Sequence, residues 1–302
     1  MIYRKLGSTG LNVSVVGLGT WQLGGEWGKK FTQQEVDRIF DAARESGITL
    51  VDTAECYGDH LSERLVGGAV KADRERWIIA TKFGHCYTTP FEREQLWSAA
   101  EVQRQLEESL SALAVGAIDL YQFHSGPNKV FENDALWTML DKQKKAGKVR
   151  HLGISVSSSM GQEDQIRQVQ RAREVGAESL QVVYNRLQRW PEESIFPICR
   201  RDNLGVLARV PLASGFLSGK YKEGAQFGPD DFRSRKTAQE LDAMAREALK
   251  IKREEVPSGV AMAAWALSWC LRDQAVTAVI PGCKSAEQVT QNAAAVRLLS
   301  GR

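Results

Sequence analysis

Four residues of the sequence could together give a proton to a carbonyl oxygen: Asp52, Tyr57, Lys82 and His124. A tyrosine has an ordinary pKa of about 10, too high to donate readily at neutral pH. A lysine ammonium nearby favours the phenolate and lowers that pKa, while an aspartate keeps the lysine charged and a histidine can orient the carbonyl. Such a set protonates the oxygen as negative charge develops on it, and the hydride must come from a cofactor.

Each of these residues also has an ordinary structural explanation. Lys82 could be a lysine at the rim of a sheet, with its methylene chain on apolar surface, and Asp52 a turn residue. His124 could be a hydrogen-bonded core histidine, and Tyr57 lies in a polar loop as a surface tyrosine would. The elements that must position the four residues decide between the two explanations.

Short apolar runs rich in β-branched residues predict eight strands, at residues 14–19, 48–54, 77–83, 118–124, 149–155, 180–185, 205–211 and 275–282. Longer amphipathic stretches between them predict helices, among them 32–46, 93–113, 135–146, 163–175 and 261–272. This alternation implies parallel strands with right-handed crossovers. Eight such units favour an α/β fold of the closed (β/α)₈ TIM-barrel type, and an open doubly wound sheet is the alternative. We expect one domain over residues 1–302, with an N-terminal β-hairpin and a short C-terminal helical tail.

Polar residues interrupt the apolar strands at one end only. Asp52, Lys82, His124, Ser155 and Asn185 all lie at or just past the C-terminal end of a predicted strand, although buried parallel strands are normally apolar. In a (β/α)₈ barrel these ends meet on the face where active sites are built. We therefore predict that these residues are neighbours in space, which favours the chemical role over the structural one.

The composition is that of an ordinary globular chain. Of 302 residues, 43% are hydrophobic and 25% charged, and the net charge of +3 is too small to indicate nucleic acid or an anionic membrane as partner. The cysteines number five, an odd count without a CxxC pair, which favours reduced thiols. With no apolar leader at the N-terminus and no run of about 18 apolar residues, we predict a cytoplasmic protein.

Eight segments in order resemble the aldo-keto reductase family over nearly the whole chain. They are GLGTWQLG (17–24), VDTAECYG (51–58), TKFG (81–84), DLYQFH (119–124), HLGIS (151–155), LQVVYN (180–185), PLASGFLSGKY (211–221) and IPGCKSAEQVTQN (280–292). The resemblance implies an oxidoreductase that reduces an aldehyde or ketone to an alcohol, or runs the reverse reaction on a sugar or polyol. It also implies NADP(H) as cofactor, with NAD(H) as the alternative, and Tyr57 as general acid and base.

The resemblance further implies a cofactor site. Ser155 and Gln181 would hold the nicotinamide carboxamide, the 211–221 loop would cover the pyrophosphate, and residues 280–292 would contact the adenosine phosphate. The full implied set is Gly19, Thr20, Trp21, Asp52, Ser155, Gln181, Tyr184, Arg209, Pro211, Leu212, Ser214, Gly215, Lys220, Arg233, Ile280, Gly282, Lys284, Gln288, Gln291 and Asn292.

The sequence departs from the family pattern at several positions. Val156 stands where an asparagine is frequent, and Arg209 occupies the region of an aromatic that commonly stacks on the nicotinamide. Gly282 and Gln288 replace the lysine and arginine of long-tailed reductases, so the chain is more similar to the bacterial and potassium-channel β-subunit-like branches. Lys284, with the serine after it, becomes the candidate for the ribose 2′-phosphate.

Aromatic side chains are expected to form the substrate pocket, which suits a small carbonyl or sugar. The predicted pocket residues are Trp21, Trp27, Tyr57, Phe83, Tyr87 and His124. Because only ten residues follow Asn292, we expect the loop 84–94 and the segment 212–235 to frame the pocket. The second of these is rich in glycine and is predicted to be a mobile flap rather than a helix.

Two other functions compete with the enzyme. A cofactor-binding regulatory subunit is possible on the same fold, but we expect the enzyme because no extension precedes the first predicted strand. A metal-dependent barrel hydrolase would need clustered histidines and carboxylates. His60, His85 and His151 are not at strand ends in such a pattern, so we expect no metal site.

Overall fold

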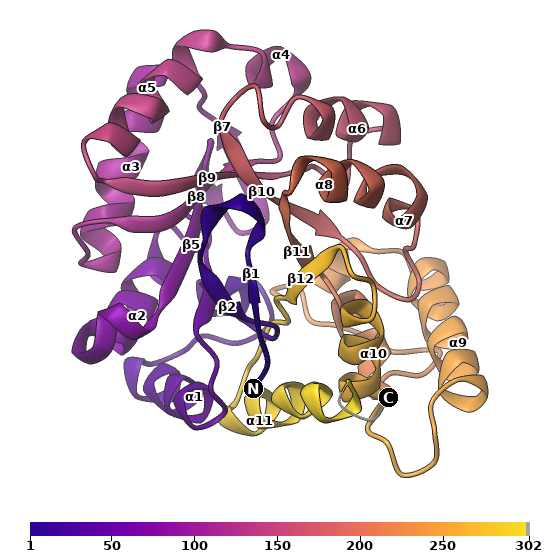
Figure 1. Ribbon diagram of the computed structural model, residues 1–302. Helices are drawn as coiled ribbons and strands as arrows, with labels where there is room; N and C mark the ends of the chain where they lie inside the picture. Colours follow the sequence, from indigo (N-terminus) through magenta and orange to yellow (C-terminus); the bar gives the residue numbers. More distant parts are fainter. Residues whose placement is uncertain (300–302) are drawn as a thin grey trace.

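A computed structural model describes residues 1–299 and contains the predicted barrel (Figure 1). Its eight parallel strands are hydrogen-bonded in chain order: β3 (Leu18–Gly19), β4 (Leu50–Asp52), β5 (Ile78–Phe83), β8 (Ile118–His124), β9 (Val149–Ser155), β10 (Ala177–Val183), β11 (Gly205–Arg209) and β12 (Val276–Val279). Parallel bridges join Val16 to Val279 and Gly19 to Gly282, so the last strand meets the first. The (β/α)₈ prediction is confirmed, and the open sheet is excluded.

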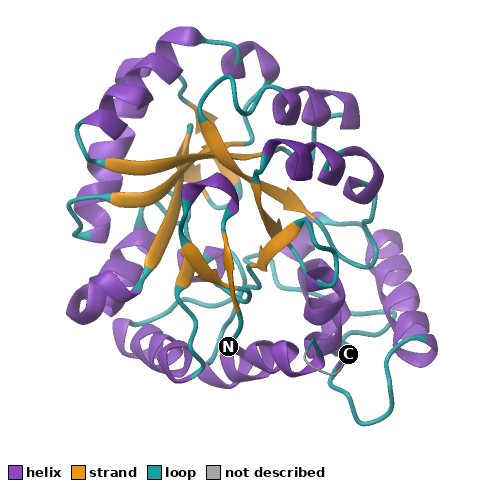
Figure 2. Cartoon of the chain, in the orientation of Figure 1, coloured by secondary structure: helices purple, strands orange, loops and turns teal. Residues whose placement is uncertain are grey.

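Helices surround the strands on the outside (Figure 2). They are α1 (Gln33–Glu45), α2 (Leu61–Val70), α3 (Ala99–Leu113), α4 (Asn128–Phe131), α5 (Asp134–Lys145), α6 (Gln162–Gln170), α7 (Pro191–Ser194), α8 (Phe196–Asp202), α9 (Ala238–Glu254), α10 (Met262–Leu271) and α11 (Ala286–Ala293). Short 3₁₀ helices lie in the connections and near the C-terminus: η1 (Gly7–Thr9), η2 (Trp21–Gly24), η3 (Lys71–Arg76), η4 (Ala213–Ser218), η5 (Phe232–Arg235) and η6 (Ala294–Leu298). The last helices form the predicted C-terminal tail.

The helix predicted over 93–113 begins later than expected. Ser98 and Glu101 form a capping box that starts α3 at Ala99. The residues before it belong to an antiparallel hairpin of β6 (His85–Thr89) and β7 (Glu92–Gln95). The loop after Lys82 is therefore a structured arm at the C-terminal end of the barrel.

The predicted N-terminal hairpin closes the opposite end of the barrel (Figure 1). It consists of β1 (Tyr3–Lys5) and β2 (Asn12–Ser14), paired antiparallel. Leu6 and Val13 from this hairpin pack with strand residues that point into the barrel, such as Leu120 and Leu207. An apolar plug thus fills the N-terminal half of the interior and leaves the other half to polar side chains.

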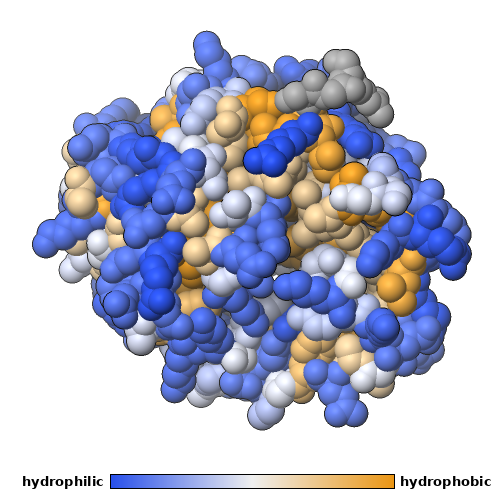
Figure 3. Space-filling model, turned by 90° about the horizontal axis from the view of Figure 1, so that it is seen from below, coloured by the Kyte–Doolittle hydropathy of each residue, from blue (hydrophilic) through white to orange (hydrophobic). Residues whose placement is uncertain are grey.

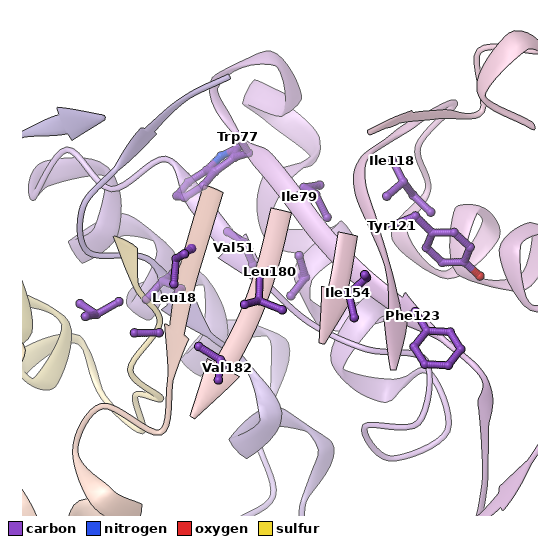
Figure 4. Close-up of a cluster of buried hydrophobic side chains, with 14 of the residues drawn as sticks. Leu18, Val51, Trp77, Ile79, Ile118, Tyr121, Phe123, Ile154, Leu180 and Val182 are labelled. Atoms are coloured by element: carbon purple, nitrogen blue, oxygen red, sulfur yellow. The ribbon is translucent and has the colours of Figure 1, made fainter. Parts of the chain in front are cut away.

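The outward faces of the strands carry a second apolar layer. Val51, Ile79, Tyr121, Ile154 and Leu180 are buried there, and Figure 4 shows how they pack beside the strands. Strands that are apolar on both faces are typical of parallel sheets covered by helices. The residues between these outward positions therefore point into the barrel.

The molecular surface is mainly hydrophilic. Figure 3 shows hydrophilic residues over most of one face, with groups of hydrophobic residues between them, most clearly at the upper centre of the view. Tyr3 is the one large hydrophobic side chain that is exposed among residues 1–299. In the same part of the chain, no helix combines the length and the apolar character that a membrane span needs.

Candidate active site

The alternation of side chains along each strand brings the polar residues together. Successive strand residues point to opposite faces, so positions two apart share a face. Three inward pairs, each an apolar residue followed by a polar one nearer the C-terminal end, are Leu50 and Asp52, Ala80 and Lys82, and Leu120 and Gln122. The apolar plug therefore supports a polar layer directly above it.

Lys82 and Asp52 form a buried ion pair in this layer. The Lys82 ammonium donates to Asp52 Oδ1 at 2.7 Å and to the carbonyl of Thr53 at 2.5 Å. Lys82 is fully buried, so it is not a rim lysine in contact with water. Burial disfavours the ammonium, but the charge of Asp52 and the contact with Tyr57 outweigh it and raise the pKa of Lys82. Lys82 therefore stays charged at neutral pH.

Two glutamines complete the environment of Asp52. Its Oδ2 accepts from the side-chain amides of Gln181 at 2.7 Å and Gln122 at 3.2 Å. Ser155 donates to Gln181 Oε1 at 3.5 Å. Gln122 was not predicted, although it lies two residues before His124 on the same strand and so shares its inward face. The alternation of side chains along a strand, by which every second residue shares a face, could have predicted Gln122.

Tyr57 lies beside Lys82 on the turn after β4. Its hydroxyl accepts from the Lys82 ammonium at 3.3 Å, and its ring stacks on Trp21 with centroids 6.0 Å apart. Burial raises the pKa of Tyr57 to about 12 and exceeds the opposing effect of Lys82. Lys82 lowers this pKa in the expected direction, but the sequence argument left out the larger cost of burying a phenolate. The phenol holds its proton at neutral pH.

His124 ends β8 and meets Tyr57 at a right angle, with ring centroids 6.2 Å apart. Burial, followed by the charges of Lys82, Arg209 and Arg93, lowers its pKa well below the ordinary value. The imidazole is therefore neutral and has one N–H to donate. Its Nδ1 faces Cys56 Sγ at 3.8 Å.

A cavity of about 690 Å³ opens above these residues at the C-terminal end of the barrel. Asp52, Tyr57 and His124 line it, and Lys82 lies behind them. All but one of the residues implied for the cofactor also line it, namely Gly19, Thr20, Trp21, Asp52, Ser155, Gln181, Arg209, Pro211, Leu212, Ser214, Gly215, Lys220, Arg233, Ile280, Gly282, Lys284, Gln288, Gln291 and Asn292. The exception is Tyr184.

Basic side chains of the cavity differ in how they are paired. Arg233 makes a two-point ion pair with Asp231, at 2.9 Å from Nε and 2.7 Å from Nη2. The Lys284 ammonium donates to the carbonyl of Trp27. Arg209 donates to the carbonyl of Val156 at 3.1 Å, but its buried Nε has no partner among residues 1–299. A buried donor without an acceptor points to a ligand that supplies one.

The sequence pattern of the Aldo/keto reductase family matches residues 15–300. The chain belongs to the aldo-keto reductase family. It is 34% identical over 240 residues to the aldo-keto reductase YhdN of Bacillus subtilis, which covers 78% of this chain and 69% of that protein. It is also 32% identical to the uncharacterized oxidoreductase YqkF of Bacillus subtilis, over 96% of this chain and 89% of that one.

Solved structures of aldo-keto reductases share the fold. The glycerol dehydrogenase AKR11B4 from Gluconobacter oxydans has a TM-score of 0.79 at 29% identity, over 97% of this chain and 89% of that chain. The holo form of aldo-keto reductase AKR11C1 from Bacillus halodurans has a TM-score of 0.79 at 29% identity, over 98% of this chain and 91% of that chain. The chain is thus an oxidoreductase of carbonyl and alcohol groups, in a family that generally uses NAD(P)H.

Besides Lys82, three residues predicted for this aldo-keto reductase site do not line the cavity. Phe83 is fully buried and packs on Tyr121 at 4.8 Å, because it is one residue past Lys82 and so points outward. Tyr184 is likewise on the outward face, where its hydroxyl donates to Glu192 at 2.8 Å. Tyr87 lies on the β6–β7 hairpin and borders a separate cavity. Each prediction followed position in the chain and ignored which face the side chain takes.

The two predicted frames of the pocket are confirmed. From the β6–β7 hairpin, Phe91 and Arg93 line the cavity, and from the segment 212–235 so does Phe232. Arg93 pairs with Glu26 at 2.6 Å. Trp21 and Trp27 are part of the same wall, with Phe232 at 4.7 Å from Trp21. Glu26, Phe91 and Phe232 also line the cavity but were not predicted. Their approach to it depends on the paths of the loops, which local sequence patterns do not determine.

The segment 212–235 is tied to the loop after β3. Asp231 forms a bridge with Trp27, and the amide of Phe232 donates to the carbonyl of Glu26 at 3.0 Å. The segment contains the 3₁₀ helices η4 and η5, where the sequence predicted only a flap. Val210, just before it, has φ of 54°, which is unusual for a β-branched residue and is typical of functional sites.

Proposed function

We propose that this chain reduces an aldehyde or ketone to an alcohol with NADP(H), or oxidises a polyol or sugar in reverse. The observation that carries the proposal is the contact of the Tyr57 hydroxyl with the Lys82 ammonium at 3.3 Å, at the cavity that His124 also lines. The similar structure from Gluconobacter oxydans is that of a glycerol dehydrogenase, which supports the polyol direction.

Tyr57 acts as the general acid of this reaction. Its raised pKa keeps the proton on the phenol until negative charge develops on the substrate oxygen. The phenolate that forms is then stabilised by the Lys82 ammonium, which Asp52 holds in place. The neutral imidazole of His124 donates a hydrogen bond that orients the same oxygen. In the reverse direction the phenolate takes the proton from the alcohol.

The cavity fits a nicotinamide dinucleotide. Ser155 and Gln181 would hold the carboxamide, and the unpaired Nε of Arg209 offers a further donor. Gly215 and Lys220 would contact the pyrophosphate, and Lys284 the ribose 2′-phosphate. When bound, the cofactor supplies the hydride. The residues of the chain bind and orient the cofactor, and they donate or accept the proton.

The test is a screen of aldehydes, ketones and polyols with NADPH, NADH and their oxidised forms, following nicotinamide absorbance. We expect turnover of at least one carbonyl class with NADPH. Binding of NADPH without turnover of any substrate would contradict the proposal and favour a cofactor-binding regulatory subunit. A pull-down would then look for the partner.

The preference for NADP(H) is tested at Lys284. A charge-assisted bond to the 2′-phosphate contributes about 1.5–3 kcal/mol, or roughly tenfold to a hundredfold in affinity. We expect Lys284→Ala to weaken NADPH by that factor and leave NADH nearly unchanged, as measured by fluorescence titration. Lys29→Ala is the matched control, because Lys29 pairs with Glu35 outside the cavity. Equal dissociation constants for the two cofactors in the unmodified chain would show that Lys284 does not read the phosphate.

Closure of the segment 212–235 is tested by hydrogen exchange. Lys220 and Arg233 of this segment line the cavity and would gain a phosphate partner when the cofactor binds. We expect amides of 212–235 to exchange more slowly with NADPH, because the segment orders over the cofactor. Peptides from α5 are the internal control, since none of α5 lines the cavity. Unchanged protection across 212–235 would rule the flap out.

A further inference from the structure

Three side chains of the types that bind metal ions, Glu55, Cys56 and His124, meet at the edge of the cavity. Glu55 and Cys56 come from the turn after β4, and His124 comes from the end of β8. His124 Nδ1 lies 3.6 Å from Glu55 Oε1 and 3.8 Å from Cys56 Sγ, and the three ligand atoms all lie within 4.8 Å of one another. The proposed reaction uses only His124, which leaves the other two without a role.

Glu55 is a buried carboxylate that lacks compensation. It is 2% exposed, its Oε1 accepts from the amide of His85 at 2.9 Å, and its Oε2 has no partner among residues 1–299. Its one ion-pairing neighbour in that part of the chain is His124, whose Nδ1 lies 3.6 Å from Oε1. Carboxylates buried this deeply are normally paired with a cation or bound to a metal.

The basic groups nearby are committed elsewhere or cannot replace a cation at Glu55. Lys82 is held by Asp52 at 2.7 Å, and Arg93 by Glu26 at 2.6 Å. Both partners are themselves buried carboxylates. Moving either basic group to Glu55 would only transfer the unpaired charge to another residue.

The three ligand types and their spacing suit zinc. Thiolate, imidazole and carboxylate are the groups that bind Zn²⁺ in proteins, usually as a tetrahedron. Bonds of about 2.0–2.3 Å in a tetrahedron place ligand atoms roughly 3.3–3.7 Å apart. Two of the three pairs here lie close to that spacing, at 3.6 and 3.8 Å, and the Glu55–Cys56 pair lies within 4.8 Å. Cys56 and His124 line the cavity, so a water molecule can reach the fourth position from it.

We propose that Glu55, Cys56 and His124 form a binding site for a zinc-like divalent cation at the edge of the catalytic cavity. The ion binds Cys56 Sγ, His124 Nδ1 and a Glu55 oxygen, and the thiol proton passes to solvent as the metal–sulfur bond forms. Occupancy inhibits the reductase because the ion and its water stand in the cavity beside His124, where the substrate oxygen would bind. The inhibition rests on the proposed function, whereas the binding does not.

Cobalt is the probe for the site, because Co²⁺ takes zinc ligands and reports on them by absorbance. We expect reduced, chelator-treated protein to bind one equivalent of Co²⁺ with a thiolate charge-transfer band and tetrahedral visible bands, and Zn²⁺ to displace it. Cys56→Ser should abolish the charge-transfer band. Glu55→Gln should weaken Co²⁺ binding by about tenfold or more, since even the partners of metal ligands contribute that much.

Cys86→Ser is the matched control, because Cys86 is the one half-buried cysteine and lines the separate cavity. It should keep the cobalt spectrum and the activity. No charge-transfer band in the unmodified protein, or a band that persists in Cys56→Ser, would overturn the site. Far-ultraviolet dichroism and the urea midpoint show whether each variant is folded.

Inhibition is measured separately with Zn²⁺ in the turnover assay. Zn²⁺ should inhibit the unmodified enzyme and Cys86→Ser, and Cys56→Ser should need at least about tenfold more. Cobalt spectra as expected without inhibition would overturn the inhibitory role. The same spectra in a protein with no turnover of any substrate would count against the proposed function and support the metal site.

Discussion

Replacing Tyr57 by phenylalanine is expected to lower kcat by about 10²- to 10⁴-fold, the range for loss of a general acid. The phenol holds its proton at neutral pH and lies 3.3 Å from the Lys82 ammonium, so the hydroxyl is the group that can deliver a proton in the cavity. Phenylalanine keeps the ring that stacks on Trp21. The dissociation constant of NADPH should therefore be unchanged.

Tyr87→Phe is the control for the loss of a hydroxyl. Tyr87 lies on the β6–β7 hairpin outside the cavity, with Arg93 over its ring at 5.0 Å. Single-turnover and steady-state rates with one good substrate would compare the two variants. Near-normal turnover of Tyr57→Phe would show that another group gives the proton.

The sequence predicted the barrel because each local signal agreed with the fold. Apolar runs at regular intervals gave the strands, and polar residues at their C-terminal ends gave Asp52, Lys82 and His124 as neighbours. Two site predictions failed because the sequence argument did not consider which face of the strand each side chain takes. Phe83 and Tyr184 stand next to inward residues but point outward, where they pack against other aromatic rings. Counting in twos from Lys82 and Gln181 would have excluded both.

Other features depend on paths that local patterns do not encode. The approach of Glu55 and Cys56 to His124 requires the turn after β4 to fold back to the end of β8, although Cys56 and His124 are 68 positions apart in the chain. The sequence contains no ligand spacing that would predict this cluster, and for that reason the sequence analysis expects no metal site. The raised pKa of Tyr57 has the same origin, because it depends on burial by Trp21 and other loop residues.

Removing the charge of Lys82 is expected to reduce both stability and activity. Lys82→Met leaves the Asp52 carboxylate buried with only amide donors from Gln122 and Gln181. Breaking one side of a buried ion pair costs about 3–5 kcal/mol. That is a large part of the free energy of unfolding of a typical protein, which is about 5–15 kcal/mol. The urea midpoint of Lys82→Met should fall accordingly, and kcat with it. Lys145→Met is the control, since the pair of Lys145 with Asp141 is exposed and contributes about 0–1 kcal/mol.

The double variant Asp52→Asn, Lys82→Met separates charge from packing. It leaves no unpaired charge in the polar layer, and the asparagine oxygen can still accept from Gln181. If the unpaired carboxylate causes the instability, the double variant should recover most of the lost urea midpoint and remain inactive, because Tyr57 still has no ammonium beside its phenolate. A double variant as unstable as Lys82→Met would instead show that the lysine stabilises the barrel by filling space.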